Sequence, residues 1–170
     1  MRKFKPIMKT HVLFFFLMVA LLAASCSTID DGDYVKPITL NEKIAGRWVV
    51  NSVVQTDESN SQKMPLTNLL DFDTFVINLN ADEDQRPTTF SVEGKAPTLL
   101  PLKGTWALDY DYTKSDATAS HIVLNSDAGV TKLTVTGVPG ADRILEYKFT
   151  RTVNGQPFVS YTYNLMSAVK

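Results

Sequence analysis

The sequence predicts an all-β fold, in which about eight antiparallel strands form one domain after an export signal. Three observations predict this fold. Apolar and polar residues alternate with period two in eight separate segments. The connections between these segments are rich in turn residues and too short for the crossover helices of a parallel sheet. From residue 26 onward the chain contains 17 Thr and 14 Val, and no window keeps a 3.6-residue apolar period beyond about two turns.

The N-terminus has the composition of a secretory signal peptide. Its first nine residues contain no acid and four bases, which are Arg2, Lys3, Lys5 and Lys9. Residues 12–24 carry no charge, but this run is too short for a membrane-spanning helix, which needs about 20 residues. A basic start, a short apolar stretch and an exit of small residues therefore predict a signal peptide over residues 1–25.

The end of this segment resembles the bacterial lipobox, since it reads Leu22-Ala23-Ala24-Ser25-Cys26. The resemblance implies cleavage before Cys26 and modification of its thiol by a diacylglycerol, with palmitate-type chains that hold the protein on membrane lipid. Cys26 is the only Cys, which excludes a disulfide framework and a Cys-based zinc site. The alternative is an ordinary signal peptide with an incidental Cys. A lipoprotein of this kind belongs to the cell envelope of a Gram-negative bacterium, and we expect the outer membrane.

Residues 26–40 are predicted to be a flexible acidic tether that contains Asp30, Asp31 and Asp33. A short acidic run after the Cys also resembles the surface-export signal of some lipoproteins, although a plain spacer explains it equally. Without residues 1–25 the chain has 13 Lys+Arg and 18 Asp+Glu, a net charge of −5. This balance excludes a strongly basic nucleic-acid binder.

The predicted domain covers residues 41–170 and begins with one helical turn at residues 42–45, with Asn41 as N-cap and Gly46 as its stop. Each predicted strand has one apolar and one mostly polar face. The eight strands are residues 46–55, 73–80, 88–93, 104–112, 120–125, 131–136, 144–153 and 158–166. Trp48, Val50 and Val54 share a face in the first, and residues 57–65 are predicted as a turn region. Such a sheet closes into a barrel or folds into a sandwich.

The last two strands allow a prediction of register. Asn154-Gly155 favours a two-residue type I′ hairpin, but that register sets Phe149 against Ser160 and joins an apolar face to a polar one. Because burial decides register, we predict a three-residue loop of residues 153–155 instead. This loop contains a type I turn and a left-handed Gly155 in a G1 bulge, and it pairs Phe149 with Val159.

Two Gly-x-Trp segments open the first and fourth predicted strands, namely Gly46-Arg47-Trp48 and Gly104-Thr105-Trp106. With the preceding helical turn, they make residues 41–170 resemble a lipocalin. More closely, the chain resembles the lipocalin-like lipoprotein domains of unknown function found in gut-type Gram-negative bacteria. The resemblance implies an eight-stranded barrel whose closed end is plugged by the Trp48 indole. It also implies that Arg151, from a late strand, packs over that indole.

Aromatic residues on the predicted inner face are the candidates to line a ligand pocket, because apolar sites use a few Tyr hydroxyls for orientation. They are Trp106, Tyr110, Tyr147, Phe149, Tyr161 and Tyr163. A close-packed aromatic core is the alternative.

Catalytic and metal-binding patterns are weak in this sequence. His121 is the only His after the signal peptide, and strand parity places it on the outer face. Asp109 and Asp111 share a polar face and are the best pair for a hydrolase. The acidic loop at residues 82–84 lacks the spacing of an EF-hand. We therefore expect no catalytic residue, no metal and no cofactor.

These observations predict a membrane-anchored module that binds a small apolar or amphipathic ligand, or part of a glycan, in its barrel. The alternative is a structural or interaction module of the cell envelope, with a filled barrel and a protein partner. Hydrolase activity is the third and weakest hypothesis.

Overall fold

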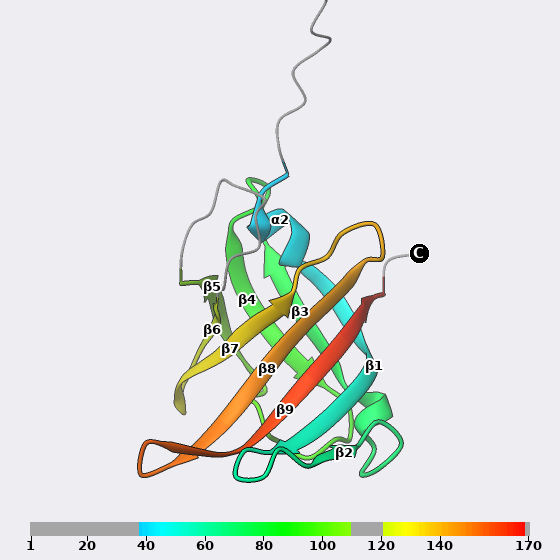
Figure 1. Ribbon diagram of the computed structural model, residues 1–170. Helices are drawn as coiled ribbons and strands as arrows, with labels where there is room; N and C mark the ends of the chain where they lie inside the picture. The colour runs from blue at the N-terminus through cyan, green and yellow to red at the C-terminus, as the bar shows by residue number, and fades with distance from the viewer. Residues whose placement is uncertain (1–37, 110–120, 169–170) are drawn as a thin grey trace, which may run out of the picture. The chain divides into compact units, whose positions relative to one another are not determined.

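The computed structural model describes residues 38–109 and 121–168, and these form strands and two short helices (Figure 1). Contacts group residues Met1–Lys36 and Pro37–Lys170 into separate units, and everything described below belongs to the second. The elements are α2 (Leu40–Ile44), β1 (Gly46–Asp57), β2 (Lys63–Pro65), η1 (Phe72–Thr74), β3 (Val76–Ala81), β4 (Pro87–Glu93), β5 (Lys103–Leu108), β6 (His121–Ser126), β7 (Gly129–Gly137), β8 (Ile144–Val153) and β9 (Gln156–Ser167). Among the described residues, neither helix is long and apolar enough to cross a membrane.

Strand β1 closes the sheet into a barrel. One edge of β1 pairs with β3 and the other with β9, from Trp48 opposite Ser167 to Asp57 opposite Val159. Consecutive strands from β3 to β9 also pair with each other, all antiparallel. Strands β1 and β3–β9 therefore form a closed eight-stranded barrel, which confirms the predicted all-β fold.

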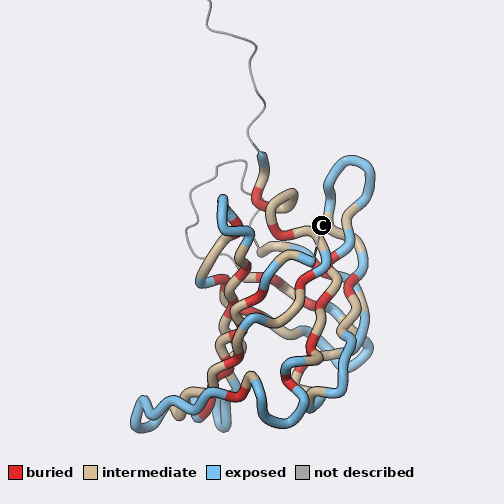
Figure 2. Tube along the Cα trace, turned by 90° about the vertical axis from the view of Figure 1, so that its right-hand side faces the viewer, coloured by how far each residue is buried: buried red, intermediate tan, exposed pale blue. Residues whose placement is uncertain are grey.

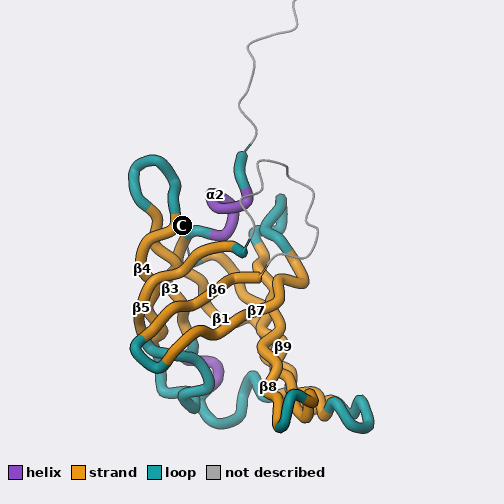
Figure 3. Tube along the Cα trace, turned by 90° about the vertical axis from the view of Figure 1, so that its left-hand side faces the viewer, coloured by secondary structure: helices purple, strands orange, loops and turns teal. Residues whose placement is uncertain are grey.

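The two ends of the barrel differ. Helix α2 and the start of β1 lie at one end, which we call the α2 end (Figure 1). The β1–β2 connection, η1, the β4–β5 loop and the β8–β9 hairpin lie at the other end, which we call the mouth (Figures 1 and 3). Buried positions recur along the strands between the two ends (Figure 2). The predicted alternation is confirmed in β3, for example, where Ile77 and Leu79 are fully buried.

Helix α2 begins earlier than predicted, because Thr39 and not Asn41 is its N-cap. The Thr39 hydroxyl accepts a hydrogen bond from the Glu42 backbone N–H, and the Glu42 carboxylate accepts one from the Thr39 backbone N–H. This reciprocal capping box satisfies two backbone donors at once, which a single Asn cap cannot do. Leu40 is buried in the core, so the folded part already includes residues of the segment predicted as tether.

The β1 side chains that point into the barrel differ from the predicted ones beyond residue 51. The register of β1 against β9 shifts between Val50 and Ser52, which leaves Asn51 as an extra residue in β1. A bulge of this kind reverses which side chains point inward. Trp48 is buried as predicted, but beyond the bulge it is Val53, and not Val54, that is fully buried.

Two short elements replace predicted loop or strand residues. Strand β2, within the region predicted as a turn, pairs with Val54, Gln55 and Thr56 of β1. The start of the predicted second strand is the 3₁₀ helix η1, and regular pairing begins only at Val76. Phe72 and Phe75 are both buried, so the tighter helix still directs apolar side chains into the core.

The β8–β9 hairpin has the two-residue turn that the prediction rejected. Asn154 and Gly155 both have positive φ values, 52° and 78°, as a type I′ turn requires, and Val153 lies opposite Gln156. The three-residue loop was therefore wrong, although Gly155 is left-handed as expected. A two-residue turn alone would set the apolar face of β8 beside the polar face of β9. A bulge prevents this, because Arg151 pairs with Val159 whereas Thr152 pairs with Pro157. Phe158 is the extra residue of this bulge.

Candidate functional site

Three of the predicted ligand-lining aromatics belong to the packed interior of the barrel. Trp106, Tyr147 and Tyr163 are at most 2% exposed. The rings of Tyr147 and Tyr163 stack with their centroids 5.1 Å apart, and Phe75 lies 4.9 Å from Tyr163. A space of about 170 Å³ remains beside Phe75 and Tyr163, under the β4–β5 loop. Sites for drug-sized ligands take roughly 300–1,000 Å³, so this space is too small for one.

A polar group without a partner among the described residues lies beside the stacked aromatic rings. The Tyr147 hydroxyl is buried and has no hydrogen-bond partner in the part of the chain that the structure describes. Burial raises the pKa of Tyr147, and the neighbouring Tyr163 raises it further. In contrast, the Trp106 indole Nε1 donates a 2.7 Å hydrogen bond to the Asn80 carbonyl oxygen. Tyr110, the sixth aromatic candidate, lies outside the described residues.

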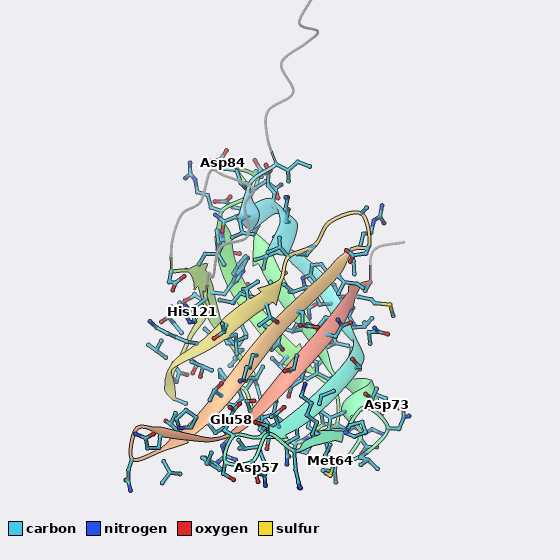
Figure 4. The ribbon with its side chains drawn as sticks, viewed as in Figure 1. Asp57, Glu58, Met64, Asp73, Asp84 and His121 are labelled. Atoms are coloured by element: carbon cyan, nitrogen blue, oxygen red, sulfur yellow. The ribbon has the colours of Figure 1, made fainter. Side chains whose placement is uncertain are left out.

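A hollow of about 300 Å³ opens at the mouth of the barrel, and we call it the mouth hollow. It is lined by Gln55, Asp57, Arg151, Phe158, Val159 and Tyr161. Figure 4 shows Asp57 at this end of the barrel, far from Asp84 at the α2 end. Phe149, another predicted aromatic, is partly buried, and its ring stacks on Tyr161 with the centroids 6.5 Å apart.

Register explains why polar side chains reach this hollow from the inner face. Gln55 lies opposite Tyr161, and Asp57 lies opposite Val159. Residues directly opposite each other in an antiparallel pair share a face. Because Tyr161 and Val159 are buried with the core, Gln55 and Asp57 also lie on the inner side. Sequence reasoning missed both residues, since the bulge at Asn51 that turns them inward leaves no mark in the hydrophobic period.

The mouth hollow combines charged groups with an aromatic surface. The Asp57 carboxylate accepts hydrogen bonds from the backbone N–H and hydroxyl of Ser59 at 2.8 and 2.6 Å, which lower the pKa of Asp57. The Arg151 guanidinium lies 5.5 Å from the centre of the Phe158 ring. The hollow therefore offers a carboxylate acceptor, a guanidinium donor and an apolar ring within one space.

Arg151 does not pack over Trp48, which corrects the contact that the lipocalin resemblance implied. Trp48 lies at the α2 end, where its indole Nε1 donates a 2.8 Å hydrogen bond to the Ile44 carbonyl oxygen. Arg151 lies opposite Val159 near the hairpin turn, at the other end of the barrel. Arg151 belongs to the long β8–β9 hairpin, which extends past the neighbouring strands (Figure 3).

His121, at the start of β6, forms a close pair with Asp109. Figure 4 shows where His121 lies on the barrel. Asp109 accepts hydrogen bonds from the His121 backbone N–H at 2.8 Å and bonds its ring Nδ1 at 2.7 Å. Partial burial raises the pKa of Asp109, but the bonds from His121 outweigh it and the pKa is lowered. Asp111 lies outside the described residues. Within the described ranges, no three His, Cys, Asp or Glu side chains are placed to hold a metal ion.

A larger hollow, about 580 Å³, lies over β4, β5 and β6. Half of its eight lining residues are Thr, Ser or Asn, and the others are Phe90, Lys103, Gly104 and Asp127. It includes none of the predicted aromatic candidates. We therefore consider the mouth hollow the better candidate site.

Comparison with protein families gives one match, to the family described as "Domain of unknown function (DUF5004)", over residues 24–166. The chain belongs to the DUF5004 family. The matched range includes Cys26 and every helix and strand described above except the end of β9. Neither the curated proteins nor the solved structures contain a significant match to this DUF5004 chain. The family confirms a domain of unknown function, while the more specific likeness to lipocalin lipoproteins stays a prediction.

Proposed function

We propose that this DUF5004 protein is a lipid-anchored envelope protein that binds a small amphipathic ligand, such as part of a glycan, in its mouth hollow. The observation that carries the proposal is the lining of that hollow. Phe158 and Val159 supply an apolar wall, and Arg151, Asp57 and Gln55 supply donors and acceptors. Sites of this kind bind by apolar contact and use a few polar groups to fix orientation.

The packing of the barrel restricts the ligand. Because Trp106, Tyr147 and Tyr163 are buried in the interior that the described residues enclose, we propose that the ligand binds at the mouth and not as a long apolar chain within the barrel. The mouth hollow, at about 300 Å³, is at the lower limit of ordinary ligand sites. A ring with hydroxyl groups fits this combination, since one of its faces is apolar and its edge forms hydrogen bonds. We propose binding rather than catalysis at this site.

The anchoring part of the proposal rests on the sequence. Cys26 follows a signal-like segment, lies outside the described residues and is included in the family match. We propose that acylated Cys26 holds the domain on membrane lipid at the outer membrane, with residues 26–37 as the connecting tether. Expression of a Cys26→Ser variant tests this step. The variant should leave the membrane fraction after cell lysis. Two results together would refute the anchor: the variant stays in the membrane fraction, and the wild-type protein carries no acyl mass.

Binding can be tested with octyl glucoside, a neutral glycoside with a short apolar chain, kept below its micellar concentration. Saturation-transfer NMR should show contacts from the protein to the sugar ring. Arg151→Ala and Phe158→Ala should each weaken the binding about tenfold, as expected for loss of a central contact. Val130→Ala is the matched control, because Val130 is also an exposed strand residue but does not line the hollow.

Two results would overturn the ligand proposal. One is the absence of any contact between octyl glucoside and the folded protein. The other is binding that survives both substitutions at the hollow. Octanol serves as a further comparison, since equal binding of octanol would show that the site does not recognise the sugar. Far-UV circular dichroism of each variant confirms that the barrel remains folded.

A further inference from the structure

The loop between β2 and η1 exposes apolar side chains while its own ends are buried. Leu66 and Phe72, at the two ends, are 2% and 1% exposed, whereas Leu69 and Leu70 are 49% and 67% exposed. Met64 on β2, 47% exposed, precedes them. Three of the nine large exposed hydrophobic residues in the described chain therefore fall within residues 64–70. We call Met64, Leu69 and Leu70 the leucine tip.

The loop is held in one conformation by hydrogen bonds. The Leu69 N–H donates to the Leu66 carbonyl oxygen at 2.8 Å, and the Phe72 N–H donates to the Leu69 carbonyl oxygen at 3.2 Å. The Thr67 hydroxyl accepts a 3.1 Å bond from the Val53 N–H, which ties the loop to β1. These hydrogen bonds therefore support the loop conformation that exposes the leucine tip.

Leu70 has two unfavourable features that the fold does not require. Its φ is 54°, in the left-handed region that Leu rarely adopts and that Gly or Asn adopts more easily. Its side chain is also among the most exposed of the apolar residues. Neither packing within the described chain nor backbone preference explains a Leu here. A strained and exposed residue of this kind motivates a hypothesis of function.

The charges beside the leucine tip indicate which partner would cover it. Asp71 and Asp73 are exposed, and neither carboxylate has a hydrogen-bond or ion-pair partner among the described residues. The chain after residue 25 also has a net charge of −5. An anionic membrane surface would repel these groups. A second copy that docked tip to tip would gather four carboxylates, two from each copy, into one small contact, and like charges at such short range are unfavourable.

We propose that the leucine tip docks a basic, apolar segment of another protein, with Leu69 and Leu70 as the apolar contacts and Asp71 and Asp73 as the charged ones. The tip lies at the mouth, opposite α2, and therefore opposite the point where the chain enters the domain (Figure 1). Figure 4 shows Met64 and Asp73 at this same end. The inference does not depend on the ligand proposed for the mouth hollow.

The test uses the mature full-length protein and a short helical peptide of leucine and lysine, with a leucine–glutamate peptide as the charge control. The lysine peptide should bind in a salt-sensitive manner, and the glutamate peptide should not bind. Leu70→Asn should weaken the binding about tenfold. Asp71→Asn with Asp73→Asn should weaken it and reduce its dependence on salt. Ile38→Asn, at an exposed apolar position of the α2 end, is the matched control and should bind normally.

Leu70→Asn has a second readout that separates docking from a structural role. Because Asn tolerates the left-handed conformation better than Leu, the variant should unfold at the same or a higher temperature while it loses binding. A lower unfolding temperature together with unchanged binding would overturn the proposal. It would also be overturned by equal binding of both peptides, by binding to phosphatidylglycerol vesicles in place of the lysine peptide, or by self-association in sedimentation that Leu70→Asn abolishes.

Discussion

The indole Nε1 of Trp48 and the carbonyl oxygen of Ile44 are joined by a 2.8 Å hydrogen bond that links β1 to α2. Both residues are buried, Ile44 completely and Trp48 to 3% exposure. The bond therefore satisfies a helix-end carbonyl that water cannot reach. It shows how the Gly-x-Trp segment closes the α2 end without the arginine contact known from the lipocalin resemblance.

Replacement of this indole should be costly. Trp48→Phe removes the donor and leaves the Ile44 carbonyl unpaired, and it also leaves a small void. We expect the free energy of unfolding to fall by roughly 2–4 kcal/mol. Urea denaturation followed by far-UV circular dichroism measures this change. A loss below about 0.5 kcal/mol, as expected for ordinary surface substitutions, would contradict the role assigned to the bond.

Two glycines with positive φ should differ strongly in their tolerance of a methyl group. A Cβ at Gly104 would lie 2.0 Å from the Asn125 carbonyl oxygen and 2.8 Å from the Phe90 ring, whereas a Cβ at Gly155 meets nothing within 4 Å. Gly155→Ala should cost about 1 kcal/mol, from backbone conformation alone. Gly104→Ala should cost more than about 3 kcal/mol, because β5 and β6 must separate. Equal thermal unfolding midpoints for the two variants would show that the backbone around Gly104 can move to accept a methyl group.

The unpaired hydroxyl of Tyr147 should destabilise the folded protein. Tyr147→Phe removes a buried polar group without a partner, so the free energy of unfolding should rise by about 1 kcal/mol at neutral pH. A decrease would indicate that the hydroxyl has a partner, such as a buried water molecule. Tyr161→Phe, at the mouth, is the matched control.

The same residue predicts a pH dependence. Burial raises the pKa of Tyr147 above its ordinary value of 10.0. As the pH rises past that value, the unfolded chain loses this proton before the folded chain does, so the folded state loses stability. Tyr147→Phe should therefore make stability fall less steeply above about pH 10. Unfolding midpoints measured at neutral and alkaline pH, in the wild type and the variant, check this slope.

An ion pair on the outer face of the barrel predicts how the stability of the protein changes at acidic pH. Glu58 accepts hydrogen bonds from Lys148 Nζ at 2.7 Å and from the Ser160 hydroxyl at 2.5 Å, and these lower the pKa of Glu58 below 4.5. The ion pair contributes its full stabilisation above the ordinary pKa of Glu58. This stabilisation is lost as the pH falls through the lowered pKa of the folded protein. Glu58→Gln should cost less than about 1 kcal/mol at pH 7, because both side chains are partly exposed. A double-mutant cycle with Lys148→Gln should give a coupling that shrinks as the pH is lowered below 4.5, and a constant coupling would refute the ion pair's role.

The candidate site could be predicted only in part. Aromatic residues on the inner face were identified from their period, and Tyr161 indeed borders the mouth hollow. The period cannot separate a residue that fills the core, such as Tyr163, from one that lines an opening, because both point inward. Gln55 and Asp57 could not be found at all, since a one-residue bulge at Asn51 decides which way they point.

The alternation of apolar and polar residues by itself determined the eight strands of the barrel, their antiparallel pairing and most of the core, because each of these strands must bury one face. Only the tertiary structure decided the strand registers at Asn51 and Phe158. At each position a bulge lets the backbone keep its local conformation while the apolar side chains remain buried. It also decided that Arg151 packs against Phe158 and not against Trp48. A period of two shows which face of a strand a residue lies on, but not how far along a long hairpin the residue lies. Local preference acts over a few residues, whereas closure of the barrel depends on contacts between residues more than a hundred positions apart.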